Sequence, residues 1–536
     1  MNSIEIAEKF KLHKITSNIL WERGYKEEEE IRNFLNPSRE HLISPSNLNN
    51  LNTAINEIKA SIEFDDNITI FTDYDVDGIT SGAIMYKSLK RAGAKNVFSH
   101  VGNRYKDGYG LSKESISEMN KENNTDLLIT VDCGINEKNN VEYAKELGMK
   151  VIVIDHHEPK KGCMPHCTCI DPKVGSYPFK HLSACGVTWK VCQELLKEPL
   201  YEYLDIVALS TVADVVDLVG ENRFIVKEGL KRLSNTKNLG LQQMIKQNKR
   251  TKNKELLTTG DVGFQIAPAI NAMGRLGHAK ICFELLITDN EERAEEIVKM
   301  LYKNNKKRQR ISKEALEDAE SRINHSDNII ILKGDYQQGI LGLVAGDLKE
   351  KYKKPTILID KSSGKGSCRS VSPLKINKLL EKNEKYLKNY GGHAYACGLE
   401  IKKGEFENFK NDLIQQTKEI TYDELDYDVY ASTEELSIDL VDDLNKLAPF
   451  GKGNPRPKIK SVVNLKSVKS VGKNNEHLKF IFDKGLSGIG FFLAGHSNKC
   501  KEKILDITYY PDINDYWGKK ELQLNVKEIR NLDIPF

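Results

Sequence analysis

The sequence has no long apolar run. No stretch of its 536 residues approaches the roughly 18 consecutive apolar residues that a membrane-spanning helix requires. The first residues, MNSIEIAEKFKLHK, also lack the uninterrupted apolar core of a signal peptide. We therefore expect a cytoplasmic protein that does not use a membrane.

Paired cysteine motifs are missing as well. The ten cysteines are scattered and do not form the framework of a disulfide-stabilised secreted domain. One cluster, CMPHCTC at residues 163–169, offers zinc ligands, but its spacing lacks the paired CxxC arms of structural zinc sites. This cysteine usage indicates a reducing compartment, and we do not expect a zinc knuckle.

The chain also carries little net charge. Its 80 Lys and Arg residues nearly balance its 77 Asp and Glu residues, which leaves +3 at pH 7. Any affinity for nucleic acid must therefore come from local patches and not from the global field. Internal repeats and low-complexity tracts are absent, and the length predicts about three to four domains.

What is present is an alternation of short apolar runs and helix-like segments between residues 67 and 220. The runs NITIFTD, DLLITVDCG and KVIVIDHHEP are rich in Val and Ile, which is typical of strands covered on both faces and predicts a parallel α/β sheet. Ligands of such sheets bind at the carboxyl ends of the strands. All three runs end on an aspartate: Asp73, Asp132 and Asp155.

Three further regions follow. From Asp289, DNEERAEEIVKMLYKNNKKRQRISKEALEDAESRI predicts one or two long polar helices with Asp289 as N-cap, connecting two lobes. A second α/β region begins with NIIILKGD and PTILID and ends near GGHAYACGLEI. From about residue 460, alternating runs such as LKFIF and LQLNVKEI predict a small β-barrel or sandwich.

Acidic and imidazole side chains gather around the predicted sheet edge. The candidates are Asp73, Asp75, Asp77, Asp132, Asp155, His156, His157, Asp214 and Asp217. A lone DxD motif is often only a helix N-cap, but several such elements at one edge favour a metal centre. Carboxylates with imidazole and without thiolate favour Mn²⁺ or Mg²⁺, with zinc as an alternative. Because one small cation cannot use so many acidic ligands, we expect two cations that share a bridging carboxylate, an arrangement typical of phosphate-ester hydrolysis.

At this point the sequence resembles the DHH phosphoesterase superfamily. DYDVDG, TVDCG, DHH and VAD are similar to its motifs I to IV, in the same order. NAMGRLGHA, GSCRS, GGHAYACG and PFGKGNPRP are similar to the bacterial single-stranded-DNA-specific exonucleases of that superfamily. The resemblance implies an exonuclease that degrades single-stranded DNA in the 5′-to-3′ direction with two divalent cations, Mn²⁺ or Mg²⁺, in DNA repair and recombination.

The resemblance also implies an α/β architecture with a parallel-sheet DHH domain, a long helical connector, a smaller α/β DHHA1 domain and a C-terminal OB-type β-barrel. The expected bounds are 1–50 for an N-terminal segment, 51–235 for the DHH catalytic domain, 236–325 for the connector, 326–425 for DHHA1 and 426–536 for the OB-fold domain, which would bind nucleic acid.

Position by position, the resemblance assigns roles to individual residues. The implied metal ligands are Asp73, Asp75, Asp77, Asp132, His156 and Asp214, with Asp132 as the bridge. The implied catalytic residues are Asp132, Asp155, His156 and His157. Asp155 would orient the imidazoles, as carboxylates commonly do behind metal-bound histidine. His157 would support the ligands or face the scissile phosphate as an acid, and which of the three leading aspartates bind metal stays open.

Other motifs would contact the substrate. The implied phosphate-binding residues are Arg275, Ser367, Arg369, Ser370, Gly391, Gly392 and His393, since arginine offers a bidentate fork and glycine allows close approach. The candidate base-stacking residues are Tyr509, Tyr510, Tyr516 and Trp517. We expect Phe491 and Phe492 in the core. We expect the basic run of Lys303, Lys306, Lys307, Arg308 and Arg310 on a solvated helix face.

Two other functions remain open. One is a phosphodiesterase for short oligonucleotides or cyclic dinucleotides, against which the C-terminal β-domain argues. The other is a non-catalytic replication or repair scaffold, against which the intact ligand set argues. The sequence departs from its relatives at Tyr336 and Gln337, where Trp-His is common, and at Asp217, where proline is usual. The implied partners are single-stranded DNA, a RecQ-type helicase and a single-stranded-DNA-binding protein, and we expect a monomer.

Overall fold

The chain folds into two compact units. The computed structural model describes residues 1–108, 110–420, 427–501, 503–516 and 519–531. The first unit, called the nuclease unit after the expectation above, comprises residues 44–214 and 229–423, and the second, the barrel unit, comprises 1–43, 215–228 and 424–536. Each unit is described by itself.

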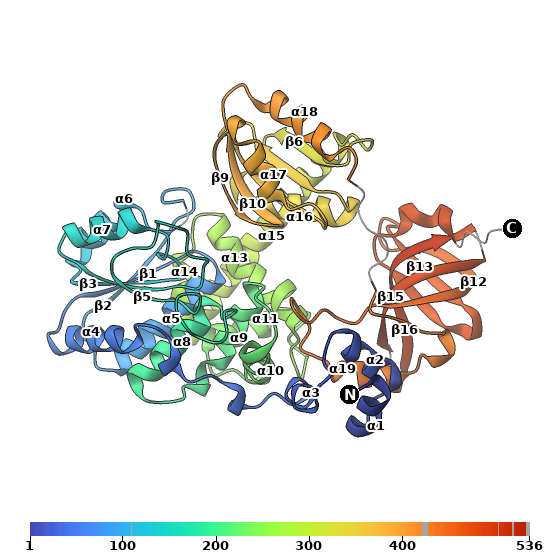
Figure 1. The fold of residues 1–536 in the computed structure, drawn as a ribbon, viewed down its shortest axis with the longest axis horizontal. Helices are drawn as coiled ribbons and strands as arrows, with labels where there is room; N and C mark the ends of the chain where they lie inside the picture. Colours follow the sequence, from blue (N-terminus) through green and yellow to red (C-terminus); the bar gives the residue numbers. More distant parts are fainter. Residues whose placement is uncertain (109, 421–426, 502, 517–518, 532–536) are drawn as a thin grey trace. The chain divides into compact units, whose positions relative to one another are not determined.

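The nuclease unit begins with a five-stranded sheet, all of whose neighbouring strands pair in parallel (Figure 1). Its strands are β1 (Ile68–Thr72), β2 (Val97–Val101), β3 (Leu127–Val131), β4 (Lys150–Ile154) and β5 (Thr168–Ile170). The spatial order β2-β1-β3-β4-β5 reverses direction between β1 and β3. In open α/β sheets the crevice at such a reversal is where ligands bind.

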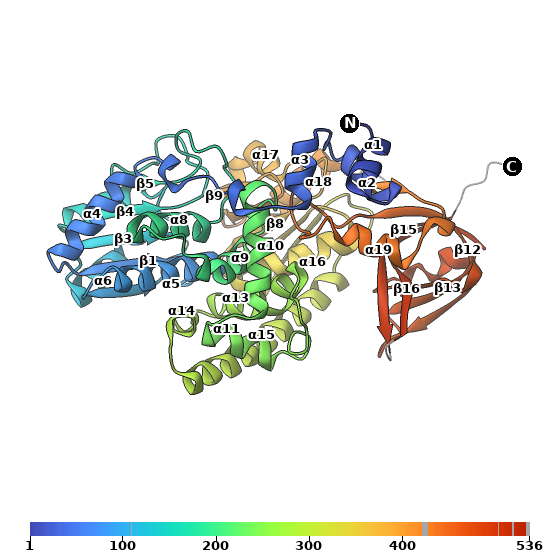
Figure 2. The same ribbon diagram turned by 90° about the horizontal axis from the view of Figure 1, so that it is seen from below.

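Helices cover both faces of this sheet. They are α4 (Leu51–Glu63), α5 (Val76–Arg91), α6 (Lys113–Asn123), α7 (Lys138–Glu146), α8 (Ala184–Leu196) and α9 (Leu204–Ala213). Phe71, Leu128 and Val153 pack with residues of α6 and α7 on one face. Side chains alternate along a strand, so Ile70 and Ile129 lie on the opposite face of the sheet. Helices α5 and α8 lie on that face and pack against each other (Figure 2). This double cover confirms the predicted parallel α/β sheet.

The connector consists mainly of helices. They are α11 (Leu239–Gln247), α12 (Thr259–Asp261), α13 (Ala267–Arg275), α14 (Lys280–Ile287) and α15 (Glu291–Ser321), while α10 (Gly220–Ser234) spans the junction of the two units. The predicted long polar helix is one continuous helix of 31 residues. Its N-cap is Asn290, whose side chain accepts from the Arg293 amide, so the prediction of Asp289 as N-cap is wrong by one residue.

The second sheet of the nuclease unit is mixed. Its strands are β6 (Ile330–Gly334), β7 (Thr356–Asp360), β8 (Lys365–Arg369), β9 (Leu387–His393) and β10 (Ala396–Ile401), in the order β6-β7-β8-β10-β9. The accompanying helices are α16 (Leu341–Tyr352), α17 (Ile376–Lys382) and α18 (Phe406–Thr417). Only β6 and β7 pair in parallel, and the remaining pairs are antiparallel.

The barrel unit contains a closed five-stranded barrel, as predicted. Its strands are β12 (Ile459–Val471), β13 (His477–Phe482), β14 (Ser487–Gly490), β15 (Ile504–Tyr516) and β16 (Lys519–Asn531), and β12 pairs with both β13 and β15. The short β11 (Val429–Tyr430) adds to β12, and α19 (Ile438–Asn445) precedes the barrel.

The N-terminal helices belong to the same core as the barrel. They are α1 (Ser3–Phe10), α2 (Lys14–Glu22) and α3 (Glu28–Leu35). Ile6, Ile19 and Phe34 share one hydrophobic cluster with Phe480 and Ile507 of the barrel. Nothing in the local sequence predicted this long-range pairing. Within the described residues, no helix is both long enough and apolar enough to span a bilayer.

Candidate metal centre

Three of the candidate ligands follow strands that are neighbours in the first sheet. Asp73 follows β1, Asp132 follows β3 and Asp155 follows β4. The register places Thr72 opposite Val131 and Val131 opposite Ile154, so the three strands end at the same level. The carboxylates therefore meet at the carboxyl edge of the sheet, as the sequence predicted, and the strand order reverses at that edge between β1 and β3.

Asp132 has a backbone conformation that few residues adopt. Its φ of 63° lies in the left-handed region, which aspartate tolerates better than most side chains. Its amide still donates to the Ile154 carbonyl at 3.0 Å, so the residue leaves the sheet only after this last ladder bond. The backbone therefore turns out of the sheet at Asp132.

Asp75 and Asp77 begin α5. One Asp75 carboxylate oxygen accepts from the Asp77 and Gly78 amides at 2.9 and 3.3 Å, which makes Asp75 the N-cap. A Cβ on Gly78 would lie 2.5 Å from the Asp73 carbonyl oxygen, so only glycine lets the helix start this close to the end of β1.

Asp77 is held by two further helices. Its carboxylate accepts from the Ala184 and Cys185 amides, each at 2.8 Å, and from the Ser210 hydroxyl. Ala184 and Cys185 open α8, where unpaired amides and the helix dipole favour a negative charge. The sequence analysis missed Ser210, which lies one helical turn before Asp214 on α9.

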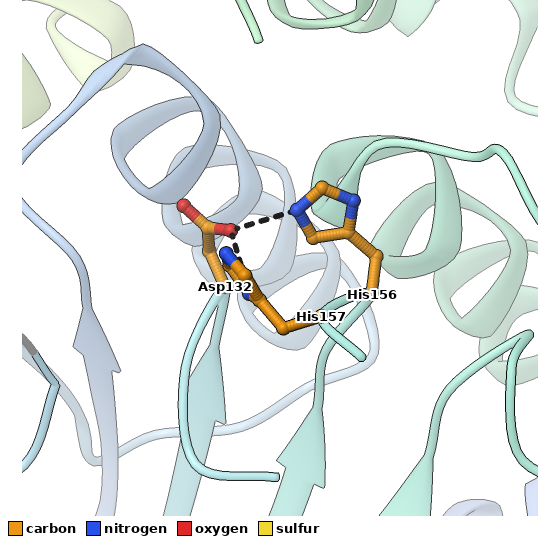
Figure 3. A group of neighbouring side chains, drawn as sticks. All are labelled: Asp132, His156 and His157. Carbon is orange, nitrogen blue, oxygen red and sulfur yellow. Dashed lines mark ion pairs between the residues drawn. The ribbon is translucent and has the colours of Figure 1, made fainter. Parts of the chain in front are cut away.

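The two adjacent histidines are oriented differently (Figure 3). Nδ1 of His156 lies 3.0 Å from the Leu182 carbonyl, which can only accept, so Nδ1 carries the proton. Nε2 is buried, makes no hydrogen bond, and lies 3.4 Å from Asp132 and 3.6 Å from both Asp77 and Asp214. An unprotonated imidazole nitrogen aimed at three carboxylates is the arrangement expected of a metal ligand.

His157 is fixed by Asp155. Its Nδ1 donates to an Asp155 oxygen at 2.7 Å, and the same oxygen accepts the His156 amide at 2.7 Å. The other Asp155 oxygen accepts from the Ile135 amide at 3.0 Å. Asp155 thus orients the ring of His157 directly, whereas the ring of His156 is oriented by the Leu182 carbonyl.

The carboxylates of this centre repel one another. Burial raises the pKa of Asp132 well above its usual value, and the neighbouring Asp77, Asp75 and Asp73 raise it further. Burial and the charge of Asp75 likewise raise the pKa of Asp73, and burial and Asp77 raise that of Asp75. Such a set becomes stable as anions only when cations offset the repulsion.

The potential ligand atoms fall into overlapping groups. The groups are Asp73, Asp75 and Asp132; Asp132, His156 and His157; and Asp77, His156 and Asp214. Asp132 belongs to two of them, as a bridging carboxylate would. Oxygen ligands with a single orphaned imidazole nitrogen suit two divalent cations such as Mn²⁺ or Mg²⁺.

Four arginines lie close enough to one another for their charges to interact, and only two of them were predicted to bind phosphate. Burial lowers the pKa of Arg275 to about 10, helped by the charges of Arg104, Arg308 and Arg369. Arg275 donates to the Gly339 carbonyl at 2.9 Å, and Arg369 donates to the Ser367 hydroxyl at 3.0 Å. Gly339 lies in the 3₁₀ turn that leads into α16.

Arg104 and Arg308 are the missed residues. The Arg104 guanidinium lies 4.3 Å from the ring centre of Tyr74, and Arg308 donates to Asn305. The Nε atom of each is buried without a hydrogen-bond partner, so each arginine keeps a donor for an acceptor outside the protein. Arg308 is therefore not on a solvated face, unlike the exposed Lys306 and Lys307 beside it.

The other predicted phosphate contacts differ in accessibility. Ser370 is buried and its hydroxyl donates to the Leu374 carbonyl at 2.7 Å. Gly391, Gly392 and His393 lie exposed at the end of β9, in a hairpin with β10.

The aromatic predictions in the barrel need correction. Tyr509 is fully buried and its hydroxyl contacts Ser461 at 2.7 Å, so its ring cannot stack on a base. Tyr510 is half-buried, with Arg456 and Lys527 near its ring. The Tyr516 side chain and Trp517 lie outside the described residues.

Phe491 and Phe492 were expected in the core, and this is wrong. Their side chains are 49% and 77% exposed. They follow the last residue of β14, so the alternation of buried and exposed side chains along that strand does not extend to them.

The departures from the family pattern lie at separate places. Tyr336 is buried and its hydroxyl donates to Asp318 at 2.8 Å, whereas Gln337 is exposed. Asp217, in the barrel unit, forms an ion pair with Lys452 at 3.5 Å.

Comparison with known families agrees with this geometry. The "DHH family, N-terminal domain" matches residues 67–211, the "DHHA1 domain" matches 326–419 and the "RecJ OB domain" matches 427–528.

Individual relatives match over most of the chain. The single-stranded-DNA-specific exonuclease RecJ of Bacillus subtilis is 31% identical over 98% of this chain and 69% of its own length. The enzyme of the same name from Haemophilus influenzae is 29% identical over 92% of each chain. The crystal structure of RecJ from Thermus thermophilus in complex with Mn²⁺ matches with a TM-score of 0.84 and 26% identity, over 99% of this chain and 78% of that one. The chain belongs to the RecJ family of single-stranded-DNA-specific exonucleases.

Proposed function

We propose that this chain is a metal-dependent exonuclease that hydrolyses the phosphodiester bonds of single-stranded DNA from the 5′ end and releases mononucleotides. One observation supports it above all: Asp132 is shared by two groups of potential ligands at the sheet edge of the unit that also holds four clustered arginines. Membership of the RecJ family supplies the substrate class.

The proposed ligands are Asp73, Asp75, Asp77, Asp132, His156 and Asp214. Two divalent cations held there would lower the pKa of an attacking water and neutralise the leaving oxygen. Leu182 and the start of α8 keep the imidazole of His156 and the carboxylate of Asp77 in the orientation that binding requires.

The arginines would position the strand. Arg275 and Arg369 each use one nitrogen within the protein, and the buried Nε atoms of Arg104 and Arg308 would find acceptors on a phosphate. Because Nδ1 of His157 is tied to Asp155, we assign Nε2 of that ring to the reacting phosphate, where it would supply a proton to the leaving oxygen. A bond from phosphorus to the water oxygen forms as the bond to the leaving oxygen breaks.

The cellular setting is part of the same proposal. All ten cysteines are free thiols, which is consistent with a reducing cytoplasm. A RecQ-type helicase would supply single strands from duplex DNA, and a single-stranded-DNA-binding protein would keep them accessible.

The test compares wild-type protein with Asp132→Ala and Asp126→Ala. Asp126 precedes the other end of β3, where it accepts from the Asn67 amide, so it is a matched control on the same strand. The substrates are 5′- and 3′-labelled single strands, the duplex and a dinucleotide, each with Mn²⁺, Mg²⁺ or EDTA. We expect cleavage of single strands only with metal, and a loss of at least about 100-fold in Asp132→Ala alone.

Two results would contradict the proposal. If the wild type cleaves dinucleotides but not long single strands, the enzyme is a phosphodiesterase for short substrates. If Asp132→Ala retains activity, Asp132 is not the bridging ligand.

A further inference from the structure

Two cysteines lie together at the edge of the first sheet. Cys167 directly precedes β5, and Cys169 is the middle residue of that strand. Side chains two residues apart in an extended chain point to the same side, and the two Sγ atoms lie 3.7 Å apart, in hydrogen-bond contact. Cys169 is 2% exposed, whereas Cys167 is half-buried. The pair is therefore a dithiol with one sulfur near the surface.

The contact between the two thiols favours a thiolate. Once one thiol has lost its proton, the other donates to the sulfur anion and stabilises it. This hydrogen bond from Cys167 lowers the pKa of Cys169, although burial opposes the shift. By contrast, burial raises the pKa of the Cys282 thiol. Because the thiolate is the form of cysteine that attacks another sulfur atom, the pair is more reactive than such a buried cysteine.

A pocket opens beside Cys167. Its volume is about 700 Å³, within the range of about 300–1,000 Å³ that is common for small-molecule sites. Its lining includes Lys145, Lys150, His166, Met149, Met164 and Glu57. Glu57 already accepts from the Thr168 hydroxyl at 3.0 Å. The Lys150 ammonium lies 4.0 Å from Asp66, at the outer limit of an ion pair, so its charge is available to an anionic ligand.

β5 is joined to the metal centre by a backbone hydrogen bond. The Asp155 amide donates to the Ile170 carbonyl at 3.0 Å, and the Asp155 carboxylate orients His157. β5 has three residues and lies at the edge of the sheet, so it moves at a lower cost than an inner strand does. A movement of Cys169 is therefore passed to Asp155 through the adjacent Ile170.

We propose that Cys167 and Cys169 are a covalent modification site, which a low-molecular-weight disulfide of an anionic thiol oxidises to a Cys167–Cys169 disulfide that lowers nuclease activity. Only the statement about activity rests on the function proposed above. The methionines of the pocket would contact the aliphatic part of the oxidant, and Lys150 would bind its carboxylate.

The reaction has two steps. A proton passes from Cys167 to Cys169, and the Cys167 thiolate attacks one sulfur of the small disulfide, so that a mixed disulfide forms and one small thiolate leaves. Cys169 then attacks Sγ of Cys167, the mixed disulfide breaks, and the second small thiol leaves. The two cysteines lose two electrons and two protons, which the small disulfide gains.

Formation of this bond must move the backbone. The sulfur atoms of a disulfide are about 2.0 Å apart, whereas those of Cys167 and Cys169 are 3.7 Å apart. The bond therefore draws the first residues of β5 toward Cys167. Because Ile170 accepts from Asp155, this displacement disturbs the carboxylate that holds His157.

The first test incubates the full-length protein with glutathione disulfide and maps the products by mass spectrometry. One tryptic peptide, residues 162–173, contains Cys163, Cys167 and Cys169. In the wild type we expect this peptide to become lighter by two hydrogen atoms. In Cys169→Ser the second step lacks its nucleophile, so the glutathione adduct should remain on Cys167. Cys163→Ser is the matched control and should form the same disulfide as the wild type.

A second oxidant tests the role of the pocket. Hydroxyethyl disulfide is neutral, so Lys150→Ala should slow oxidation by glutathione disulfide and leave oxidation by hydroxyethyl disulfide unchanged. Equal rates of the wild type and Lys150→Ala with glutathione disulfide would overturn the assignment of an anionic oxidant. Absence of the lighter peptide, or its presence in Cys167→Ser, would overturn the modification site.

The last test measures nuclease activity before and after oxidation. We expect the oxidised wild type to lose at least about tenfold, the lower limit for loss of a group that supports metal ligands. Dithiothreitol should restore the activity, and Cys167→Ser should keep its activity under the same treatment. Unchanged activity of the oxidised wild type would overturn the link to the metal centre. Mass mapping requires no cleavage of DNA, so an inactive reduced protein would contradict the proposed exonuclease and not the dithiol.

Discussion

The two neighbouring histidines have opposite protonation, which burial sets for His156 and Asp155 sets for His157. Burial alone would raise its pKa, but the hydrogen bond and charge of His157 outweigh burial and bring the pKa to about 2. Burial would lower the pKa of His157, yet the bond to Asp155 raises it to about 9. Burial lowers the pKa of His156. At neutral pH one ring is therefore neutral, as a metal ligand must be, and the other is a cation.

Asp171 provides a test of pH dependence at a residue that is not a proposed metal ligand. It is fully buried, one carboxylate oxygen accepts from the Lys173 amide at 2.7 Å, and the other has no partner. Burial raises its pKa to about 7, whereas an unfolded aspartate titrates near about 3.9. Between these values the folded state keeps a proton that the unfolded state loses, so the stability contributed by this group falls as pH rises from about 4 to 7.

We expect Asp171→Asn to gain stability relative to the wild type as pH rises. One pKa unit corresponds to about 1.4 kcal/mol. The free energy of unfolding of the variant minus that of the wild type should therefore rise by at least that amount between pH 5 and pH 8. Urea unfolding in EDTA measures it without interference from metal. The exposed Asp65→Asn serves as the control, and an equal difference at both pH values would contradict the prediction.

The sequence predicts those site residues that directly follow a buried strand. Asp73, Asp132 and Asp155 were predicted because each follows an apolar run. Arg104 was missed because the preceding strand β2 is an edge strand of intermediate burial, which has no clear apolar run. In the barrel, alternation requires Tyr509 and Tyr510 to face opposite sides, but only closure of the barrel decides which of them is inside.

At the scale of elements, the start of α5 lies against the end of β1 with no room for a larger side chain. Gly78 lies in the first turn of α5, against the backbone of Asp73. Any larger residue must move the helix and with it the carboxylates of Asp75 and Asp77.

We expect Gly78→Ala to destabilise the protein by about 1–3 kcal/mol, the range for overpacking, and to reduce nuclease activity at a given metal concentration. Gly346→Ala is the control, because Gly346 lies inside α16 and a Cβ added there would meet no neighbouring group within 4 Å. That change should raise stability by up to about 1 kcal/mol. Thermal unfolding and metal titrations measure both, and unchanged metal dependence in Gly78→Ala would refute the argument.

The elements differed in how well the sequence predicted them. The apolar runs before Asp73, Asp132 and Asp155 gave β1, β3 and β4 because buried parallel strands are continuous in hydrophobicity. The edge strands β2 and β5 were not predicted, since an edge strand has fewer covering groups and a weaker pattern. The helix from Glu291 to Ser321 was predicted in extent but not in its cap, because Asp289 and Asn290 are both good N-caps.

At the scale of the molecule, each unit has a core of its own, and all proposed metal ligands lie in the nuclease unit. Ile19 is fully buried in the other core. We therefore expect calorimetry to show two unfolding transitions, one for each unit. Metal binding should shift one of them, and a change in the core of the barrel unit should shift the other.

Mn²⁺ at 100 times its Kd should stabilise the nuclease unit by about 2.7 kcal/mol. The temperature of the unfolding transition of that unit should therefore rise. Ile19→Ala should lower the transition of the barrel unit, because loss of a buried isoleucine costs about 2–5 kcal/mol. The control is Ile4→Ala, whose side chain is 68% exposed on the neighbouring helix α1. Shifts of both transitions by either change would show that the units unfold together.

The shared core of the N-terminal helices and the barrel has a consequence for synthesis. α1 to α3 leave the ribosome well before their packing partners, which begin about 400 residues later. At about 5–20 residues per second, these helices wait for roughly 20 to 80 s with their apolar faces uncovered. The segment from α1 to α3 thus exposes apolar surface while the nuclease unit folds. Chaperones that bind exposed apolar surface would therefore bind this segment during translation.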